Sequence, residues 1–223
     1  MKPIETERLV IDAIREDDKA DYFANISHDK KVLETFICNY ADRLEEFDFS
    51  KYLGREELFA IRQKSTGRLM GIILYFDAKE GQCEVGYGIG SRFWNQGYAT
   101  EALKAFLQFL FYGKGFEKVY ASHFVGNEAS RRVMEKCGMK YSHTSEKELT
   151  YLEKERDLIY YVTNKGEQIM EKQVVTITIK TEGDVCQMSD AEIKDWYKEK
   201  VASLFNPAYG TPEIDVTLER KQA

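Results

Sequence analysis

The chain has 223 residues, of which 43% are hydrophobic and 31% are charged, and its formal net charge is −6 at pH 7. This length and composition favour one sizeable globular domain, or one domain with a small appendage, and exclude a disordered chain. The acidic balance argues against a nucleic-acid-binding surface and suits a cationic amine or a basic peptide as partner.

Neither a membrane span nor a metal site is predicted. No apolar run reaches the roughly 18 residues of a spanning helix, and the opening MKPIETERL has no signal-peptide core after its lysine, so we expect a cytoplasmic protein without a membrane partner. The four cysteines and three histidines are scattered and form no CxxC pair. We therefore expect no bound metal, and reduced thiols that are mostly buried.

The N-terminal quarter predicts a strand followed by helices. Residues 8–14 alternate as a strand, and the segment 15–18 offers a cap for a helix over about residues 20–26. A second helical stretch is expected over residues 30–36. Residues 39–54 then mix acids with leucine and aromatic side chains, for which a place in the core is the simplest interpretation.

Three strands follow in an antiparallel meander. Residues 57–63 and 68–77 flank a polar turn that ends in glycine, and a third strand is expected over residues 83–90. This third strand contains Gly86, Gly88 and Gly90. Because glycine weakens a strand interior, these glycines predict a bulge or a ligand lying against the backbone.

The stretch from Cys83 to Phe111 reads as a strand, a glycine-containing turn and a long amphipathic helix. Gly97 and Ala99 flank Tyr98 at the turn, and Thr100 and Glu101 then open the helix. Small residues at the start of a helix let an anion approach backbone amides at the positive end of the helix dipole, so the turn is either a phosphate-binding loop or an ordinary turn. Neither GxxxxGK[ST] nor GxGxxG leading straight into a helix is present, which argues against nucleotide hydrolysis and hydride transfer.

The remaining elements complete a mixed α/β pattern. A strand is expected over residues 117–125, a helix capped by Asn127 and ending before Gly138, and two strands over residues 139–145 and 157–163. The order strand, two helices, three strands, helix, strand, helix and two strands predicts an α/β fold in the first domain, residues 1–166.

A small C-terminal extension, residues 167–223, follows. Residues 174–180 alternate as a strand, residues 189–205 read as a helix with Ser189 and Glu192 as a capping box, and residues 213–219 read as a strand. A β-α-β unit of about fifty residues buries little core of its own, so we expect it to dock on the first domain or to complete a homodimer.

Three segments resemble a known family. GYGIGSRFWNQGYATEAL, residues 86–103, resembles motif A of the GNAT superfamily of acetyl-CoA-dependent N-acyltransferases, and its form is similar to the ribosomal-protein-acetyltransferase (RimJ/RimL-like) branch. IETERL at residues 4–9 and NEASRRVMEKCGM at residues 127–139, which resembles motif B, match in the same order. Trp94 stands where the superfamily pattern has Gln or Arg.

The resemblance implies a mostly antiparallel central sheet flanked by helices. It also implies acetyl-CoA as co-substrate, and transfer of the acetyl group to a primary amine, either a protein N-terminus or a small molecule, by direct attack. In such folds the helices after the first strand form a wall of the acceptor pocket, which offers a second role for the aromatic residues of segment 39–54. A CoA-binding regulatory or interaction module without turnover is the alternative, since Met134 stands where many family members have a tyrosine that protonates the leaving thiolate.

The resemblance also assigns roles to particular residues. Glu84 is expected to deprotonate the amine through water, against the alternative of a solvated strand face, and Ser130 lies where a serine approaches the CoA sulfur, against the alternative of a helix-start serine bonded to backbone. Asn127 matches an asparagine that contacts pantetheine. The expected CoA-binding residues are Ile89, Gly90, Asn95, Gln96, Gly97, Tyr98, Ala99, Thr100 and Asn127.

Overall fold

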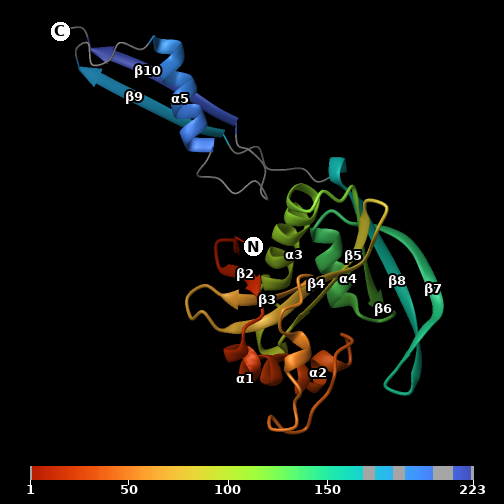
Figure 1. The fold of residues 1–223 in the computed structure, drawn as a ribbon. Helices are drawn as coiled ribbons and strands as arrows, with labels where there is room; N and C mark the ends of the chain where they lie inside the picture. The colour runs from red at the N-terminus through yellow and green to blue at the C-terminus, as the bar shows by residue number, and fades with distance from the viewer. Residues whose placement is uncertain (1, 168–173, 183–188, 203–212, 222–223) are drawn as a thin grey trace. The chain divides into compact units, whose positions relative to one another are not determined.

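The computed structural model describes residues 2–167, 174–182, 189–202 and 213–221 (Figure 1). The chain divides into two compact units, Met1–Gln168 and Ile169–Ala223. The first unit contains one eight-stranded sheet with helices packed against it, so the predicted mixed α/β fold is confirmed.

The sheet has the order β1-β2-β3-β4-β5-β6-β8-β7. All neighbours are antiparallel except β5 and β6, which are parallel. The strands are β1 (Ile4–Glu5), β2 (Leu9–Ala13), β3 (Leu58–Gln63), β4 (Leu69–Lys79), β5 (Gln82–Ile89), β6 (Lys118–Phe124), β7 (Lys140–Tyr151) and β8 (Lys154–Asn164).

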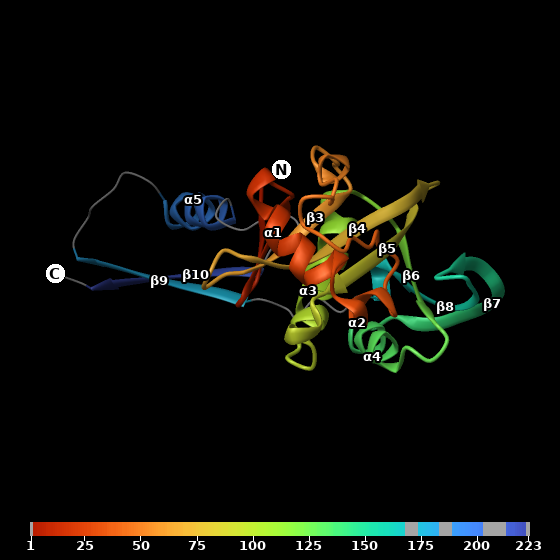
Figure 2. The same ribbon diagram turned by 90° about the horizontal axis from the view of Figure 1, so that it is seen from below.

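The last two strands are longer than their sequence pattern predicts. Strand β7 continues to Tyr151 and forms a long hairpin with β8, which Figure 2 shows at one end of the sheet. The added residues of β7 are mostly polar and exposed, so they carry no apolar alternation to signal a strand. Leu152 and Glu153 turn the chain with positive φ values of 51° and 59°.

The helices are α1 (Lys19–Tyr22), α2 (Lys30–Leu33), α3 (Tyr98–Gln108) and α4 (Glu128–Lys136). Helix α2 is a single turn, shorter than predicted. Helix α1 is also a single turn, but a wider π-type turn, Phe23–Ser27, continues it, so the two together span the predicted residues 20–26. The side chain of Asp29 accepts the amide of Lys31 and so begins α2 as a cap.

Two groups of buried side chains hold these layers together. On one face of the sheet, α3 buries Leu103, Phe106 and Leu107. A second cluster centres on the Tyr22 ring, which packs within 4.5–5.7 Å, between ring centroids, of Phe47, Phe49 and Tyr52. These three aromatic residues of segment 39–54 are buried, so they belong to the core.

The second unit is a β-α-β arrangement. Strands β9 (Val174–Glu182) and β10 (Glu213–Lys221) pair in parallel, and α5 (Asp190–Ala202) connects them in sequence. The Ser189 hydroxyl and the Glu192 side chain exchange backbone hydrogen bonds at the start of α5, as the capping box predicts. The predicted helix end at residues 203–207 lies outside the described residues.

Within the described part of the chain, no helix is long and apolar enough to cross a membrane. The same residues contain no cluster of three metal-ligating side chains. Cys83 and Cys137 are buried, and burial raises the pKa of both thiols to about 12. Cys38 is half-buried, and Cys186 lies outside the described residues.

Candidate active site

The central feature of the site is a gap between two neighbouring strands of the sheet. Strands β5 and β6 pair only over Gln82–Glu84 and Lys118–Tyr120. Beyond Glu84, β5 stays paired with β4 as far as Ile89, and β6 stays paired with β8 as far as Phe124. The two strands therefore diverge, and the facing edge of β5 has no strand partner there.

Backbone polar groups of β5 point into this gap. The amide of Gly90 donates to the Met70 carbonyl at 3.0 Å, on the β4 side. Because successive residues of a strand direct their backbone groups to opposite edges, the amide and carbonyl of Ile89 point toward β6. The Ile89 carbonyl accepts a hydrogen bond from the Trp94 indole at 2.7 Å, which agrees with this direction. The Ile89 amide thus faces the gap.

Helix α3 begins next to the gap in a conformation that exposes its first amides. Asn95 and Gly97 have φ values of 60° and 82°, and the first backbone hydrogen bond of the helix runs from the Glu101 amide to the Gly97 carbonyl at 3.0 Å. The amides of Tyr98 to Thr100 precede that bond, so the helix supplies them with no acceptor. They form a cradle at the positive end of the helix dipole.

The N-terminal segment holds this helix start in place, which no pattern in the sequence indicated. The carboxylate of Glu101 accepts hydrogen bonds from the Thr6 hydroxyl at 2.6 Å, the Arg8 amide at 2.9 Å and the Arg8 guanidinium at 2.7 Å. Arg8 also donates to the Gln96 carbonyl and lies over the Tyr98 ring. We call this set, Thr6, Arg8 and Glu101, the α3 brace.

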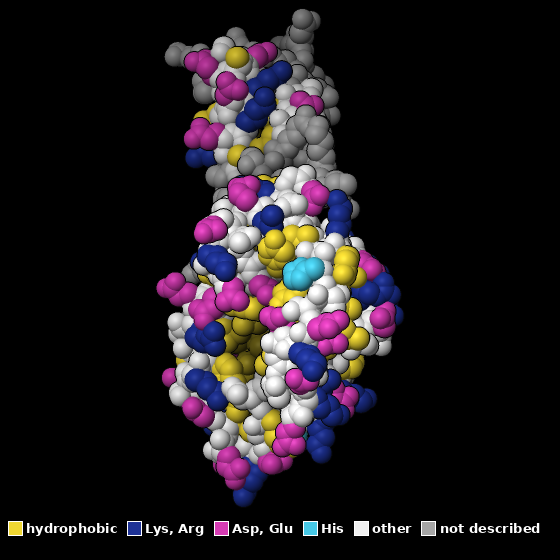
Figure 3. Space-filling view, turned by 90° about the vertical axis from the view of Figure 1, so that its right-hand side faces the viewer, with side chains coloured by type: hydrophobic (Ala, Val, Ile, Leu, Met, Phe, Trp, Pro, Cys, Tyr) yellow, Lys and Arg dark blue, Asp and Glu magenta, His cyan; other side chains and the backbone are white. Residues whose placement is uncertain are grey.

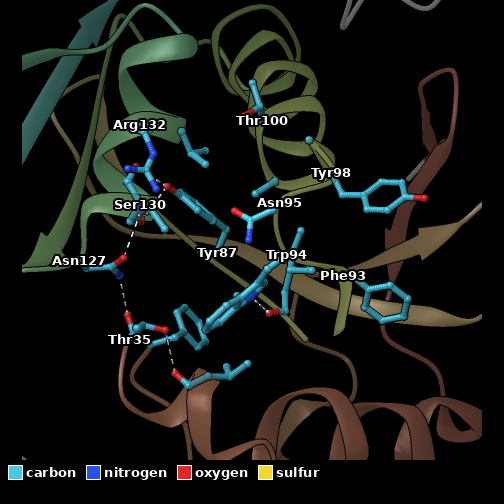
Figure 4. Close-up of a pocket in the computed structure, with 18 of the residues that line it drawn as sticks. Thr35, Tyr87, Phe93, Trp94, Asn95, Tyr98, Thr100, Asn127, Ser130 and Arg132 are labelled. Carbon is cyan, nitrogen blue, oxygen red and sulfur yellow. Dashed lines mark hydrogen bonds between the residues drawn. The ribbon is translucent and has the colours of Figure 1, made fainter. Parts of the chain in front are cut away.

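A pocket of about 450 Å³ lies between the α3 start, the gap and α4 (Figure 4). Figure 3 shows one face of the molecule hollowed, with hydrophobic side chains on the floor and charged side chains around it. The pocket is lined by Val32, Thr35, Phe36, Tyr87, Gly88, Ile89, Phe93, Trp94, Asn95, Gly97, Tyr98, Ala99, Thr100, Asn127, Ala129, Ser130, Arg132, Val133 and Lys136.

The pocket reaches both faces of the sheet through the gap. Phe36 lies on the α2 side, where its ring would be 2.9 Å from a Cβ placed on Gly88. Tyr87 points to the opposite face, where its hydroxyl contacts α4. Gly88 and Gly90 are thus explained by side chains of the chain itself, Phe36 and Asn25, that pack against the strand.

The segment after α2 crosses the open end of the gap. Its Thr35 carbonyl accepts a hydrogen bond from the Asn127 side chain at 3.4 Å, and the Phe36 carbonyl accepts one from the Tyr151 hydroxyl of β7 at 3.2 Å. Asn127 also caps α4, because its side-chain oxygen accepts the amide of Ser130 at 3.1 Å. The asparagine therefore connects the two walls of the pocket (Figure 4).

Glu84 lies at the vertex of the gap, on the same face of the sheet as Phe36. It is half-buried, and its carboxylate accepts a hydrogen bond from the Ser122 hydroxyl of β6 at 2.6 Å. Burial raises the pKa of Glu84, the Ser122 hydrogen bond opposes that shift, and the charges of Asp77 and Glu148 add to it. A carboxyl with a raised pKa is better suited to take a proton near neutral pH.

Ser130 lies on the opposite face, in the first turn of α4. Its hydroxyl pairs with the Tyr87 hydroxyl at 2.9 Å, and its backbone carbonyl accepts a second contact from the same phenol at 3.2 Å. Met134, one turn further along α4, is buried in the core. The sequence patterns did not single out Tyr87, because nothing local links residue 87 to residue 130.

The structure brings most of the predicted site residues together. Ile89, Asn95, Gly97, Tyr98, Ala99, Thr100, Asn127 and Ser130 all line the pocket. Gly90, Gln96 and Glu84 do not, and the amide of Gly90 is already bonded to Met70. Figure 4 shows the Tyr98 ring turned away from Tyr87 and Trp94, so Tyr98 contributes mainly its backbone.

Two positively charged side chains of α4 line the pocket. Arg132 and Lys136 line it, whereas Arg131 faces outward and pairs with Glu128 at 2.7 Å and Glu135 at 2.8 Å. Positive side chains and free helix amides in one cavity suit a phosphorylated ligand. The apolar end at Phe36 and Trp94 suits an uncharged group.

The fold and the comparisons with known proteins together define the class of this protein as an acetyltransferase. The family model for the "Acetyltransferase (GNAT) domain" matches residues 8–140. The chain therefore belongs to the GNAT acetyltransferase family, as the three sequence segments predicted, and it is an N-acetyltransferase.

The chain is also similar to individual proteins and structures. The chain is 31% identical over 151 residues to the uncharacterized protein YkkB of Bacillus subtilis, covering 64% of this chain and 87% of that protein. A GNAT-family acetyltransferase structure from Bacillus anthracis superposes with a TM-score of 0.66 at 25% identity, over 74% of this chain and 99% of the other. The ribosomal-protein-S5-alanine acetyltransferase of Vibrio fischeri shares the fold, with a TM-score of 0.65 at 15% identity over 75% of this chain and 99% of the other.

Proposed function

We propose that the protein transfers an acetyl group from acetyl-CoA to a primary amine by direct attack of the amine on the thioester. The thioester supplies an activated acetyl group, and the residues of the chain bind, orient and move protons. The observation that carries the proposal is the gap between β5 and β6, because it joins a pocket with free helix amides to the opposite face of the sheet.

The donor side of the pocket fits a CoA molecule. The amides of Tyr98 to Thr100, with Arg132 and Lys136, would hold its phosphates. The β5 edge and Asn127 would hold its pantetheine arm, which carries amide groups that match an unpaired strand edge. Gly90 and Gln96 have no direct part in this arrangement.

Three groups would serve the chemistry. The Ile89 amide points into the gap and is placed to donate a hydrogen bond to the thioester carbonyl oxygen, the interaction that stabilises developing negative charge. Glu84 would accept the proton of the attacking amine through water from the other face of the sheet. Ser130 would donate a proton to the departing sulfur.

The acceptor is a primary amine, either a protein N-terminus or a small molecule. A shared fold with an acetyltransferase of ribosomal protein S5 supports the first option. The negative charges of Glu84, Asp77 and Glu148 beside the gap suit the cationic amine that either acceptor presents. We also propose a cytoplasmic location, where acetyl-CoA and such amines are available.

The test combines CoA titration calorimetry with an assay for free thiol release over a panel of amines: peptides beginning with alanine or serine, polyamines, aminoglycosides and amino acids. Saturable CoA binding with amine-dependent thiol release is expected. CoA binding without turnover on any amine would favour a regulatory CoA-binding module, which Met134 in the core, at the position of the usual tyrosine, makes the second candidate.

A further inference from the structure

We propose that Tyr87 is a positioning residue that orients the Ser130 hydroxyl as the proton donor to the CoA sulfur, an inference that rests on the proposed function. The two hydroxyl oxygens are 2.9 Å apart, and both residues line the pocket. They come from different elements, β5 and α4, on the same face of the gap (Figure 4). In this proposal, Tyr87 and Ser130 together do the work of the tyrosine that many family members have at the position of Met134.

Two hydrogen-bond arrangements of the pair are possible, and they differ in which hydroxyl donates to the other. The phenol carries one proton and has two acceptors within reach, the Ser130 hydroxyl oxygen at 2.9 Å and the Ser130 carbonyl oxygen at 3.2 Å. If the phenol donates to the hydroxyl oxygen, the serine proton is free to point into the pocket. If it donates to the carbonyl, the serine donates to the phenol and has no proton for a substrate. We assign the first arrangement, because the phenol oxygen lies closer to the hydroxyl oxygen, at 2.9 Å, than to the carbonyl oxygen, at 3.2 Å.

The environment of Tyr87 keeps its phenol protonated, as a hydrogen-bond donor must be. Burial raises the pKa of its phenol, and the hydrogen bond that it shares with Ser130 offsets that rise only in part. The phenol is therefore neutral throughout the pH range in which the amine can attack. A neutral donor on the serine oxygen also stabilises the negative charge that the oxygen acquires when it releases its proton.

The transfer step involves one bond formed, one bond broken and three proton movements. The amine nitrogen bonds to the acetyl carbon, and the carbon–sulfur bond breaks with its electron pair on sulfur. The sulfur takes the Ser130 proton, the amine gives its surplus proton to water at Glu84, and the serine oxygen regains a proton from solvent. Tyr87 donates a hydrogen bond throughout and transfers no proton.

The decisive measurement needs no acceptor. The thiol pKa of CoA bound to the protein can be followed by the ultraviolet absorbance of the thiolate in wild type, Ser130→Ala, Tyr87→Phe and the double variant. A hydroxyl that donates to the thiolate lowers its pKa, so Ser130→Ala should raise the thiol pKa by roughly one to two units and Tyr87→Phe by roughly half as much. The double variant should match Ser130→Ala.

Turnover supplies the second readout. With an amine that the panel identifies, Ser130→Ala should lower kcat roughly 100-fold and Tyr87→Phe roughly tenfold, with KM for acetyl-CoA unchanged. Tyr161→Phe is the matched control, since Tyr161 is also a buried tyrosine whose hydroxyl contacts α4, at Glu135, but lies outside the pocket. Its kcat should equal that of wild type.

The outcomes separate this inference from the proposed function. An unchanged thiol pKa in Tyr87→Phe, or a double variant whose shift is the sum of the single shifts, would overturn the positioning role while CoA binding and amine turnover stand. A faster Tyr87→Phe would indicate the second hydrogen-bond arrangement and would also overturn it. Absence of saturable CoA binding in wild type would overturn both.

Discussion

At the scale of single residues, the turn before α3 uses a backbone conformation that suits its proposed role. Gly97 has a φ of 82°, and a Cβ placed there would meet the Arg8 guanidinium at an ordinary distance of 3.5 Å. Space therefore permits a side chain, but the backbone conformation disfavours one. Glycine is favoured at this position for two reasons: the positive φ, and the close approach of a phosphate to the backbone in the proposed function. Comparison with a valine variant at another glycine of similar φ separates the two reasons.

Gly97→Val should lower CoA affinity at least tenfold, which corresponds to about 1.4 kcal/mol, because the side chain would stand over the amide cradle. Gly115→Val is the control, since Gly115 has a φ of 81° and nothing within 4 Å of its Cβ position. Both variants should lose roughly 1–2 kcal/mol of unfolding free energy. Equal CoA affinities in the two variants, measured by calorimetry, would contradict the cradle assignment.

Glu84 is the residue whose environment most directly predicts a pH dependence. Its pKa is raised by burial and by the charges of Asp77 and Glu148. Glu84→Gln should lower kcat roughly 100-fold with unchanged CoA affinity, and it should flatten the acid limb of the pH–rate profile. Glu148→Gln removes a like charge and should move that limb to lower pH. A wild-type rate in Glu84→Gln would leave Glu84 without a catalytic part.

The raised pKa of Glu84 also predicts how this residue affects the stability of the folded protein: the charged carboxylate costs stability at neutral pH. The folded-state pKa of Glu84 lies above its unfolded value, so the folded protein binds this proton more tightly. The resulting stabilisation is complete below the unfolded pKa, about 4.3, and is lost as the pH rises through the folded pKa. Glu84→Gln should therefore have a higher thermal midpoint than wild type at pH 7, and the difference should disappear near pH 4.

At the scale of elements, the position of α3 depends on a contact far away in the sequence. The α3 brace connects the segment before β2 to the first turn of the helix, whose amides form the cradle. Burial raises the pKa of Glu101, but the hydrogen bonds from Thr6 and Arg8 outweigh it and lower the pKa overall. The carboxylate is thus stabilised by its partners.

Glu101→Gln should cost roughly 1–3 kcal/mol of unfolding free energy, because it removes charge-assisted hydrogen bonds at a mostly buried position. Because the folded pKa is lowered, the contribution is present above the unfolded pKa and is lost as the pH falls through the folded one. Urea unfolding at pH 7 and pH 3 measures both effects. Glu128→Gln, which breaks an exposed pair with Arg131 on α4, should cost less than about 1 kcal/mol; a similar loss in both variants would count against the brace.

At the scale of the whole molecule, the divergence of β5 and β6 opens one pocket to both faces of the sheet, and in the proposed function two substrates would meet there from opposite sides. The side of the pocket with the helix amides and Ser130 lies on the α3 and α4 face, and Glu84 lies on the α1 and α2 face. In the proposed function the donor and the acceptor therefore do not compete for one entrance. This arrangement permits direct transfer without a covalent enzyme intermediate.

The C-terminal unit is proposed to serve stability or assembly and not CoA binding. Among the described residues, β9 and β10 pair only with each other, so each strand has an outer edge without a partner. Truncation after Gln168 keeps Glu167, which bonds Lys140 and Asn164. The truncated protein should bind CoA with unchanged affinity and should aggregate or change its oligomeric state, as measured by light scattering. The same particle mass and thermal midpoint as the full chain would indicate an independent module.

Sequence alone determined the elements whose signals are local. Asn127 as the cap of α4 and the capping box at Ser189 depend on residues within one turn of each other, so spacing and residue type suffice to predict them. Helix α3 begins at Tyr98, two residues before the predicted start at Thr100. The family was also determined, because three ordered segments carry it. The single turn α2 and the exposed end of β7 were mispredicted in length because their boundaries depend on packing against other elements.

Only the tertiary structure decided how the site is assembled. Glu101 meets Arg8, Tyr87 meets Ser130 and Asn127 meets Thr35 across separations that no local pattern encodes. It also decided that Gly88 makes room for Phe36 and that the Gly90 amide belongs to the β4 ladder, since glycine in a strand signals a close approach without naming what approaches. The physical reason is that a pocket forms where elements diverge, and the divergence of β5 from β6 is a property of the whole sheet.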